Sequence, residues 1–283
     1  MTKKAVLIND ISGLGKCSLT AAIPVLSVMG IQACPMPTAV LTSQTGFKSF
    51  YCNDCTDKLD YYTSEWKKLG FQPDGIYTGF LSSEKQVDKI LDFINSFETE
   101  NTLVLVDPVM GDGGRTYSLF TDALACKMKK LVTVADVITP NLTECCILCD
   151  VDYCEFIKNA DKPDFMDKIA ELGKNLLNRY GVKIVIITGI EHKDIEGTMY
   201  VQNLIASKDE VFSVSCKKIG GSYSGTGDLF ASVMFSGLLR GDTLRDTVSL
   251  AVKFIETSLR DTVALGIDRN EGIEFEKHLK ILL

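Results

Sequence analysis

The 283-residue sequence has only two histidines, one tryptophan and no extended run of basic residues. Histidine is the usual base in nucleophilic catalysis, and neither a Ser-His-Asp nor a Cys-His set can be assembled persuasively from His192 and His278. The densest basic cluster is Lys127, Lys129 and Lys130, and 30 basic against 37 acidic residues give a net charge of −7. These features argue against nucleic acid as a partner.

Long apolar runs are also missing. The longest one, residues 21–31, is interrupted by Pro24, Ser27 and Gly30 and is far too short to span a bilayer. Near the N-terminus only four apolar residues precede Asn9, which is too few for a secretory signal. We therefore expect a cytoplasmic protein that makes no membrane contact.

Cysteine, in contrast, is plentiful, and without an export signal the ten cysteines are expected to be reduced thiols. Cys52 with Cys55 and Cys146 with Cys149 have the CxxC spacing of zinc knuckles. The two pairs lie far apart in the sequence, and the second is in an apolar stretch with helical character. Buried or half-buried thiols are therefore favoured over a zinc site.

The hydrophobic fraction of 46%, with 24% charged residues, is typical of a globular chain with a large core. Apolar runs predict strands at residues 5–8, 32–34, 75–77, 103–106, 137–138, 183–187, 199–201 and 211–215. Amphipathic runs predict helices at 19–29, 57–69, 83–97, 119–131, 142–149, 165–180, 226–240, 243–260 and 272–282. This alternation predicts an α/β fold, with a mostly parallel central sheet between two layers of helices, in a single domain over residues 1–283.

Polar residues gather where the predicted strands end. Asn9-Asp10, Asp107-Pro108, Thr139-Pro140-Asn141 and Thr188-Gly189 each follow a strand. Because ligands of open α/β sheets bind at the carboxyl ends of the strands, these clusters indicate a binding site.

The sharpest motif is GGSYSGTGDLFAS, residues 220–232. Gly225, Thr226 and Gly227 can turn the chain into a helix whose free N–H groups attract a phosphate or another developing anion. Asp228 would repel a bound phosphate, but it is well suited to take a proton from a hydroxyl nucleophile beside one. The alternative is that Asp228 only caps the helix.

Two further motifs carry carboxylates. In TPNLTE, Asn141 and Glu144 lie three residues apart, which allows either water-mediated Mg²⁺ binding or a capping box, or both. Asp107 and Asp112 flank a glycine loop after an apolar strand. The segment SGLGKC, residues 12–17, is similar to a Walker A loop but lacks its first glycine and its Ser/Thr.

Three of these motifs together resemble the ribokinase superfamily and, more narrowly, its vitamin B6 kinases. They are Asp107-Pro-Val-Met-Gly-Asp112, Thr139-Pro-Asn141-Leu-Thr-Glu144 and Gly225-Thr-Gly-Asp228, in family order and spacing. The resemblance runs from the first strand to the helix after Asp228. It implies a ribokinase-like fold and a phosphotransferase with an alcohol acceptor, which uses ATP to phosphorylate the hydroxymethyl group of pyridoxal, pyridoxine or pyridoxamine.

The resemblance also implies roles for the matching residues. Asp228 would be the base, and Gly225, Thr226 and Gly227 the anion hole. The residues that would bind Mg²⁺ and the ATP phosphates are Asp107, Asp112, Asn141 and Glu144. Thr139 and Thr188 would lie along the phosphates and the ribose of ATP. The vitamer would be bound by Asp10, Cys17, Gln44, Thr45, Phe47 and Phe80, beside Asp228. A monovalent cation such as K⁺ is a further cofactor that the resemblance allows, and a homodimer is common among such proteins.

The sequence departs from the pattern at two positions. Asp10 stands where many pyridoxal kinases have serine, and Phe80 where tyrosine is common. The stretch NDISGLGKCS also resembles hydroxymethylpyrimidine kinases of thiamine synthesis, and a carboxylate there favours a ligand that carries an amine. Hydroxymethylpyrimidine therefore remains an alternative substrate, with sugars or nucleosides less favoured because Phe47 and Phe80 suit an aromatic ring. A pyridoxal phosphate carrier is the non-enzymatic alternative, but a carrier has no use for a base.

Overall fold

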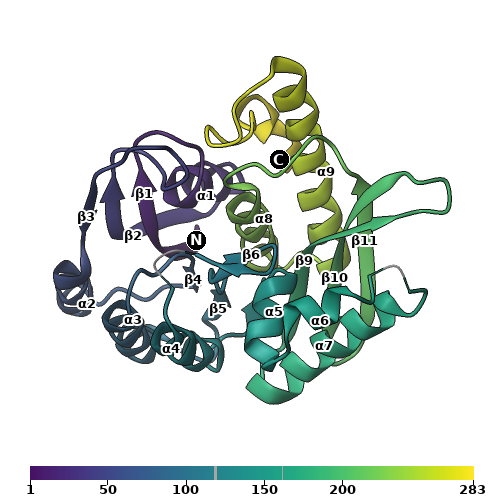
Figure 1. Ribbon diagram of the computed structural model, residues 1–283. Coiled ribbons are helices and arrows are strands. Elements are labelled where there is room, and N and C mark those ends of the chain that lie inside the picture. The colour runs from purple at the N-terminus through teal and green to yellow at the C-terminus, as the bar shows by residue number, and fades with distance from the viewer. Residues whose placement is uncertain (118–119, 161) are drawn as a thin grey trace. The chain divides into compact units, whose positions relative to one another are not determined.

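The computed structural model describes residues 1–117, 120–160 and 162–283 (Figure 1). The chain forms two compact units, each assembled from separate stretches of sequence. Unit 1 comprises Met1–Leu81, Lys89–Leu103 and Ile219–Leu283, and unit 2 comprises Ser82–Asp88 and Val104–Lys218. The single domain over residues 1–283 stays a prediction.

The strands of unit 1 are mostly parallel. Their order is β4 (Gly75–Thr78), β1 (Lys4–Ser12), β2 (Gln32–Leu41) and β3 (Cys52–Asp54). β1 is parallel to both β2 and β4, whereas β3 is antiparallel to β2. β1 continues beyond the expected 5–8, so Asn9 and Asp10 lie within the C-terminal half of the strand rather than after it. Because the parallel strands share one direction, these two residues lie toward the same edge as the end of β4.

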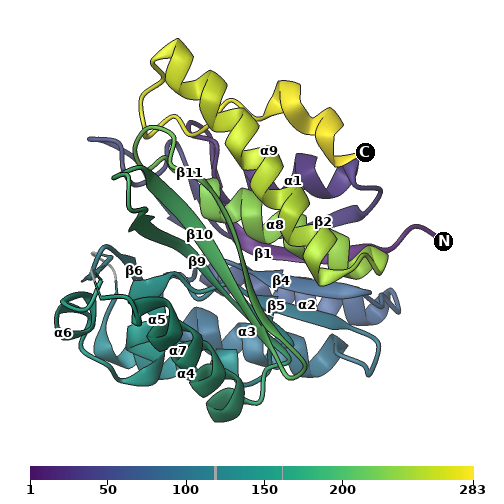
Figure 2. The same cartoon turned by 90° about the vertical axis from the view of Figure 1, so that its right-hand side faces the viewer.

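Helices cover both sides of these strands (Figure 2). They are α1 (Ser18–Val28), η1 (Thr56–Lys58), α2 (Leu59–Lys68), most of α3 (Glu84–Phe97), α8 (Thr226–Arg240), α9 (Leu244–Leu265) and η2 (Glu276–Leu282). α1 packs on β1 and β2 and also against α8, which in turn packs against α9. Gly75 gives room for this packing, since a Cβ on it would lie 2.8 Å from the Phe235 ring of α8.

Unit 2 has its own set of strands, in the order β5 (Leu103–Val106), β8 (Val137–Ile138), β9 (Ile184–Lys193), β10 (Met199–Ser207) and β11 (Val211–Lys217). β5, β8 and β9 are parallel, and β10 is antiparallel to both of its neighbours. A separate hairpin is made of β6 (Gly111–Asp112) and β7 (Arg115–Thr116). The helices are α4 (Asp122–Val132), α5 (Leu142–Cys149), α6 (Tyr153–Ile157) and α7 (Phe165–Tyr180), and α7 packs on β9 and β10.

The α/β class and its mostly parallel strands are confirmed, and several element boundaries are corrected. β2 continues to Leu41, far beyond the expected 32–34. The predicted helix at 272–282 is a 3₁₀ helix that starts only at Glu276. The helix expected at 57–69 begins with a 3₁₀ turn at Thr56–Lys58. Residue 119, the expected start of the helix at 119–131, lies outside the described residues, and α4 starts at Asp122.

The structure can be compared with two further expectations, which concern the cysteines and His192. All ten cysteines are free thiols. His192, expected in a solvent-exposed loop, lies instead in β9, where its ring stacks on Tyr200 with centroids 5.6 Å apart. Within the described ranges, no helix is both long enough and apolar enough to cross a membrane.

Candidate active site

A left-handed glycine opens the helix that carries Asp228. Gly225 has φ +81° and occupies the N-cap position of α8, so Asp228 lies in the first turn of the helix. The interpretation of Asp228 as the N-cap is therefore wrong. A Cβ on Gly225 would lie 1.9 Å from the carbonyl oxygen of Lys16, so this turn needs glycine both for its backbone angle and for its close approach.

The Asp228 carboxylate is half-buried and held by two donors. The side-chain amide of Asn9 donates to Oδ1 at 3.2 Å, and the backbone N–H of Ser18 donates a second hydrogen bond. Burial, together with the nearby charge of Asp10, raises the pKa of Asp228 to about 6, although the two hydrogen bonds act in the opposite direction. A carboxylate that titrates near neutral pH is a better proton acceptor than an ordinary aspartate.

Asp10 is buried, with both of its carboxylate oxygens engaged. The Ser18 hydroxyl donates to Oδ1 at 2.6 Å and the Ser12 hydroxyl donates to Oδ2 at 3.1 Å. Burial raises the pKa of Asp10, and these hydrogen bonds oppose the increase. Ser18 has a left-handed φ of 49°, which is uncommon for a residue with a Cβ, and this conformation lets it serve both carboxylates.

The other residues expected around the vitamer differ in their surroundings. Cys17 is buried, and burial with the charges of Asp228 and Asp10 raises the pKa of its thiol to about 12. Its neutral thiol is thus near both carboxylates. Phe47 and Phe80 are half-buried, and Thr45 is exposed. The backbone N–H of Phe80 donates to Asn9, so the same asparagine contacts Asp228 and the end of β4.

In unit 2 the buried Glu144 caps its own helix. Glu144 Oε2 accepts from the backbone N–H of Asn141 at 2.8 Å, and Asn141 Oδ1 accepts from the backbone N–H of Glu144 at 3.0 Å. This is the capping box that the sequence allowed. Glu144 Oε1 accepts from the backbone N–H of Met110, so the glutamate also holds the loop after β5.

Four other predicted ATP-binding residues lie near that glutamate. The Thr139 hydroxyl donates to Asp107 Oδ1 at 3.0 Å. Thr188 donates its backbone N–H to the carbonyl of Pro140, and it pairs with Asn141 in an isolated bridge. Asp107, Thr139, Asn141, Glu144 and Thr188 are therefore neighbours at the ends of β5, β8 and the first half of β9.

Asp112 is exposed, on the β6–β7 hairpin. The hairpin turns at Gly113 and Gly114, both with positive φ. It is fastened to the start of α5 in two places. Asn141 Nδ2 donates to the carbonyl of Gly111 at 2.8 Å, and Gly114 N–H donates to the hydroxyl of Thr143 at 2.9 Å. The glycine loop is therefore an ordered hairpin.

The carboxylates of unit 2 suit a magnesium ion that is held through water and phosphate oxygens. Burial raises the pKa of Glu144 well above its usual range, and the charge of Asp107 raises it further. A divalent cation would compensate this excess of negative charge. Among the described residues no three His, Cys, Asp or Glu side chains form a cluster that could hold a metal ion by themselves.

Two contributors were missed in the sequence. Asn9 was expected only as part of a polar cluster, and Ser18 lies just before the helix predicted at residues 19–29 and was given no role. The signal for Asn9 was its position at the end of β1. For Ser18 no sequence signal exists, because its role depends on an unusual backbone angle and on contact with a residue 210 positions later in the chain.

Comparison with known proteins extends this description. The sequence profile of the Phosphomethylpyrimidine kinase family matches residues 19–272. A crystal structure of a Bacteroides thetaiotaomicron relative with pyridoxal has a TM-score of 0.91 and 39% identity, covering 100% of this chain and 96% of the other. The pyridoxal kinase of Lactobacillus plantarum has a TM-score of 0.87 and 25% identity, covering 100% and 97%.

A curated Schizosaccharomyces pombe relative is 29% identical over 207 residues, which is 71% of this chain. The chain spans 57% of that relative's length. The profile match covers most of the sequence, and the structural likeness extends over both units. The chain belongs to the phosphomethylpyrimidine kinase family, whose structural neighbours include pyridoxal kinases.

Proposed function

We propose that this protein is an ATP-dependent kinase that phosphorylates the 5′-hydroxymethyl group of a vitamin B6 compound: pyridoxal, pyridoxine or pyridoxamine. The observation that carries the proposal is Asp228, a half-buried carboxylate with a pKa of about 6 in the first turn of α8. Family membership supports the phosphotransferase class. The relative that was crystallised with pyridoxal, at 39% identity, supports the vitamer.

In the proposed reaction Asp228 accepts the proton of the hydroxymethyl group as its oxygen attacks the terminal phosphoryl group of ATP. Asn9 and Ser18 keep the carboxylate oriented toward the acceptor. The N–H groups of Gly225, Thr226 and Gly227, at the positive end of α8, stabilise charge on the transferring phosphoryl. An unactivated alcohol needs both contributions, since it is a weak nucleophile and the phosphate is an anion.

The residues of unit 2 would bind ATP and its metal. Asp107, Asp112 and Glu144 would hold Mg²⁺ through its waters, with Asn141, Thr139 and Thr188 along the phosphates. When bound, Mg²⁺ neutralises phosphate charge. The hydrogen bonds that Glu144 accepts from the backbone N–H groups of Met110 and Asn141 hold these loops in place.

On the vitamer side, Asp10 would face the polar substituents of the ring, and Cys17, Thr45, Phe47 and Phe80 would line the pocket. The raised pKa of Cys17 makes its thiol a neutral lining group rather than a nucleophile. A K⁺ requirement, a homodimeric state and a cytoplasmic location remain predictions from the resemblance and the composition.

Hydroxymethylpyrimidine is the second candidate substrate. Two observations favour it: the matching profile is that of phosphomethylpyrimidine kinases, and Asp10 offers a carboxylate to an aminopyrimidine. Both substrates present a hydroxymethyl group on a heteroaromatic ring, so Asp228 would perform the same step on either.

The test is ADP release with ATP and Mg²⁺ against pyridoxal, pyridoxine, pyridoxamine, hydroxymethylpyrimidine and ribose, with an acceptor-free reaction as the control for ATP hydrolysis. Turnover above the control with the B6 vitamers alone is the expected result. Preference for hydroxymethylpyrimidine would retain the chemistry and change the substrate. ADP release at the control rate with every acceptor would contradict the proposed substrate class.

A further inference from the structure

The backbone of Lys16 packs between two left-handed glycines. A Cβ on Gly225, which opens α8, would lie 1.9 Å from the Lys16 carbonyl oxygen, and a Cβ on Gly272, with φ +85°, would lie 3.0 Å from the same atom. The backbone N–H of Lys16 donates to the carbonyl oxygen of Glu271 at 3.1 Å. The position of Lys16 is therefore coupled to the turn that is proposed to stabilise the transferring phosphoryl group.

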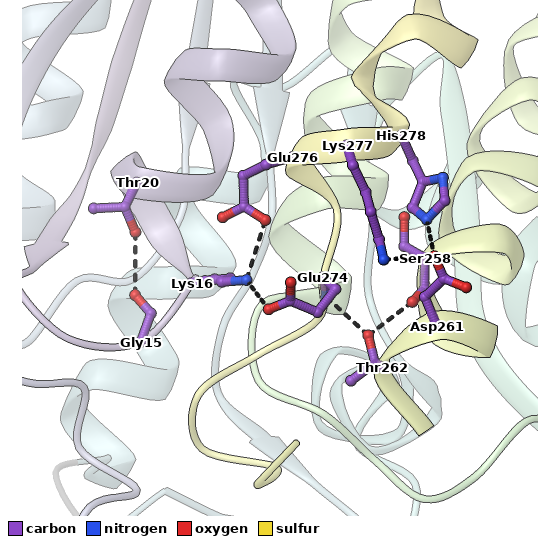
Figure 3. A network of polar contacts seen from close by, with 10 residues as sticks. All are labelled: Gly15, Lys16, Thr20, Ser258, Asp261, Thr262, Glu274, Glu276, Lys277 and His278. Atoms are coloured by element: carbon purple, nitrogen blue, oxygen red, sulfur yellow. Dashed lines mark hydrogen bonds and ion pairs between the residues drawn. The ribbon is translucent and has the colours of Figure 1, made fainter. Parts of the chain in front are cut away.

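The side chain of Lys16 is held by two carboxylates (Figure 3). Its ammonium group pairs with Glu274 and, at 3.1 Å, with Glu276. Burial alone would lower the pKa of Lys16, but the hydrogen bonds and charges of the two glutamates outweigh burial and raise it. Glu274 is fixed in turn, because its backbone N–H donates to the hydroxyl of Thr262 in α9 at 2.8 Å. The ammonium group is thus tied to α9 through the segment that follows this helix.

The two residues directly after Lys16 contact the surroundings of the proposed base. Cys17 is the N-cap of α1, and its buried thiol lies near the carboxylates of Asp228 and Asp10. The backbone N–H of Ser18 donates to Asp228, and the Ser18 hydroxyl donates to Asp10 at 2.6 Å. Ser18 makes both contacts from a left-handed φ of 49°, a conformation that persists only where the surrounding structure holds it. The chain at the start of α1 therefore needs an anchor, and the side chain of Lys16 provides one.

We infer that the ion pairs of Lys16 with the two glutamates hold the chain at the start of α1 in place. Lys16 is therefore a positioning residue for Asp228 and acts on it through Ser18. A phosphate ligand, which the similarity of residues 12–17 to a Walker A loop suggests, would be repelled by the two glutamates beside the ammonium group. The inference rests on the proposed function for the role of Asp228 as the base. The contacts that carry it all lie within unit 1.

The first variant is Lys16→Met, which keeps an unbranched side chain and removes the ammonium group. Ser18 should then lose its hydrogen bond to Asp228, and amide exchange at Ser18, followed by NMR, should accelerate roughly tenfold. The acid limb of the pH profile of kcat/KM for pyridoxal should move from a pKa of about 6 to about 7, because losing one hydrogen bond raises the proton affinity of a carboxylate about tenfold. We expect kcat to fall about tenfold as the base loses its orientation, with the KM for ATP within about twofold.

The double variant Glu274→Met with Glu276→Met separates positioning from a direct effect of charge. It removes negative charge, whereas Lys16→Met removes positive charge, so a direct effect would move the pKa of Asp228 in opposite directions in the two variants. Positioning predicts the same upward shift and the same faster exchange at Ser18 in both. The three substitutions combined should then add nothing to the effect of Lys16→Met, because all of them break the same contact. Lys16→Arg keeps the positive charge and should behave as the wild type.

Lys277→Met is the matched control, because it removes an ion pair between η2 and Asp261 of α9 that does not involve Lys16. It should leave the pH profile and the exchange at Ser18 unchanged. Three results would each overturn the inference: shifts of opposite sign in the lysine and glutamate variants, exchange at Ser18 at the wild-type rate in Lys16→Met, or an equal change in Lys277→Met. Should the wild-type protein phosphorylate no B6 vitamer, the proposed function fails, and the exchange at Ser18 still decides whether the ion pairs hold the start of α1.

Discussion

At the scale of single residues, Asp228 depends on partners from the opposite end of the chain. Asn9 lies in β1 and Ser18 opens α1, and both donate to a carboxylate that is carried by α8. Two carboxylates, Asp10 and Asp228, share Ser18 and raise the pKa of the Cys17 thiol between them. Such a group of buried acids is costly to the folded state and is typical of a functional site.

That cost can be measured in the Asp228→Asn variant. Because the pKa of Asp228 is raised to about 6 from 3.8, the folded state binds the proton more tightly than the unfolded state. This contribution to stability is complete below pH 4 and is lost as the pH rises through about 6. Urea unfolding at pH 7.5 should therefore find Asp228→Asn more stable than the wild type by up to about 3 kcal/mol, with the difference vanishing near pH 4. A difference independent of pH, or one shared by Asp209→Asn at an exposed site, would contradict this origin.

Asp10→Ser tests the choice of vitamer. Where the Asp10 carboxylate recognises an amine, the ratio of kcat/KM for pyridoxamine to that for pyridoxal should fall roughly tenfold, as expected for one charge-assisted hydrogen bond. The ratio cancels any general loss from freeing the hydroxyls of Ser12 and Ser18. Steady-state kinetics with both vitamers measures it, and a ratio equal to that of the wild type would dismiss the role.

At the scale of elements, two helix N-termini carry the proposed chemistry and are built differently. α8 starts at a left-handed glycine, and no side-chain cap from the described residues contacts its first turn, which leaves that turn available to an anion. α5 starts at a complete capping box, whose glutamate also holds the loop after β5. The N-terminus of α8 is thus available to bind an anion, whereas the N-terminus of α5 holds the neighbouring loop in place.

The two ends of α8 provide a matched pair of glycines. Gly225 and Gly241 have φ values of +81° and +88°, but a Cβ meets the Lys16 carbonyl only at Gly225, and nothing lies within 4 Å at Gly241. Gly241→Ala should lower the free energy of unfolding by about 1–2 kcal/mol through backbone strain alone. Gly225→Ala should cost more and should also lower kcat strongly, because the turn must move away from Lys16. Equal effects of the two variants on kcat would show that the close approach is unimportant.

The β6–β7 hairpin is tested through Thr143. Thr143→Val keeps the shape of the side chain and removes the acceptor for Gly114 N–H. We expect the KM for ATP to rise several-fold, while the KM for the vitamer stays the same, because Asp112 lies on that hairpin. Thr143→Ser restores the hydroxyl and should restore the KM. If the KM for ATP is unchanged in Thr143→Val, the hairpin does not contribute to nucleotide binding.

At the scale of the whole molecule, the sequence predicts which polar residues lie at the strand ends, and within unit 2 the structure brings these residues together. Thr139, Asn141 and Glu144 follow β8 as expected, because apolar runs mark parallel strands clearly. The length of β2 was missed because Pro35 and Pro37 argue against a strand. They are tolerated because β3 pairs with β2 at Ala39, Val40 and Leu41, so Pro35 and Pro37 lie in the part of β2 that β3 does not reach, where a missing N–H breaks no pairing to β3.

The remaining features depend on contacts between segments that lie far apart in the sequence, so the sequence alone does not predict them. The C-terminal helix was expected at 272–282 from its amphipathic pattern, but Glu271 and Glu274 make hydrogen bonds to Lys16 and Thr262 instead, and only Glu276–Leu282 forms a 3₁₀ helix. The hydrogen bonds of the Gln44 amide to Asn270 and Gly46 were likewise not predictable, and its role as a substrate ligand stays a prediction. Contacts between segments more than 200 residues apart leave no periodic signal in the sequence.

The most direct measurement is the amount of vitamer 5′-phosphate formed by the wild type and by Asp228→Asn, from pyridoxal, ATP and Mg²⁺, followed by mass-resolved chromatography. We expect the wild type to form pyridoxal phosphate. The variant should bind ATP with the same Kd and form the product roughly 10²–10⁴-fold more slowly, the loss expected on removing a general base. Product formation by Asp228→Asn at nearly the wild-type rate would contradict the assignment of Asp228 as the base.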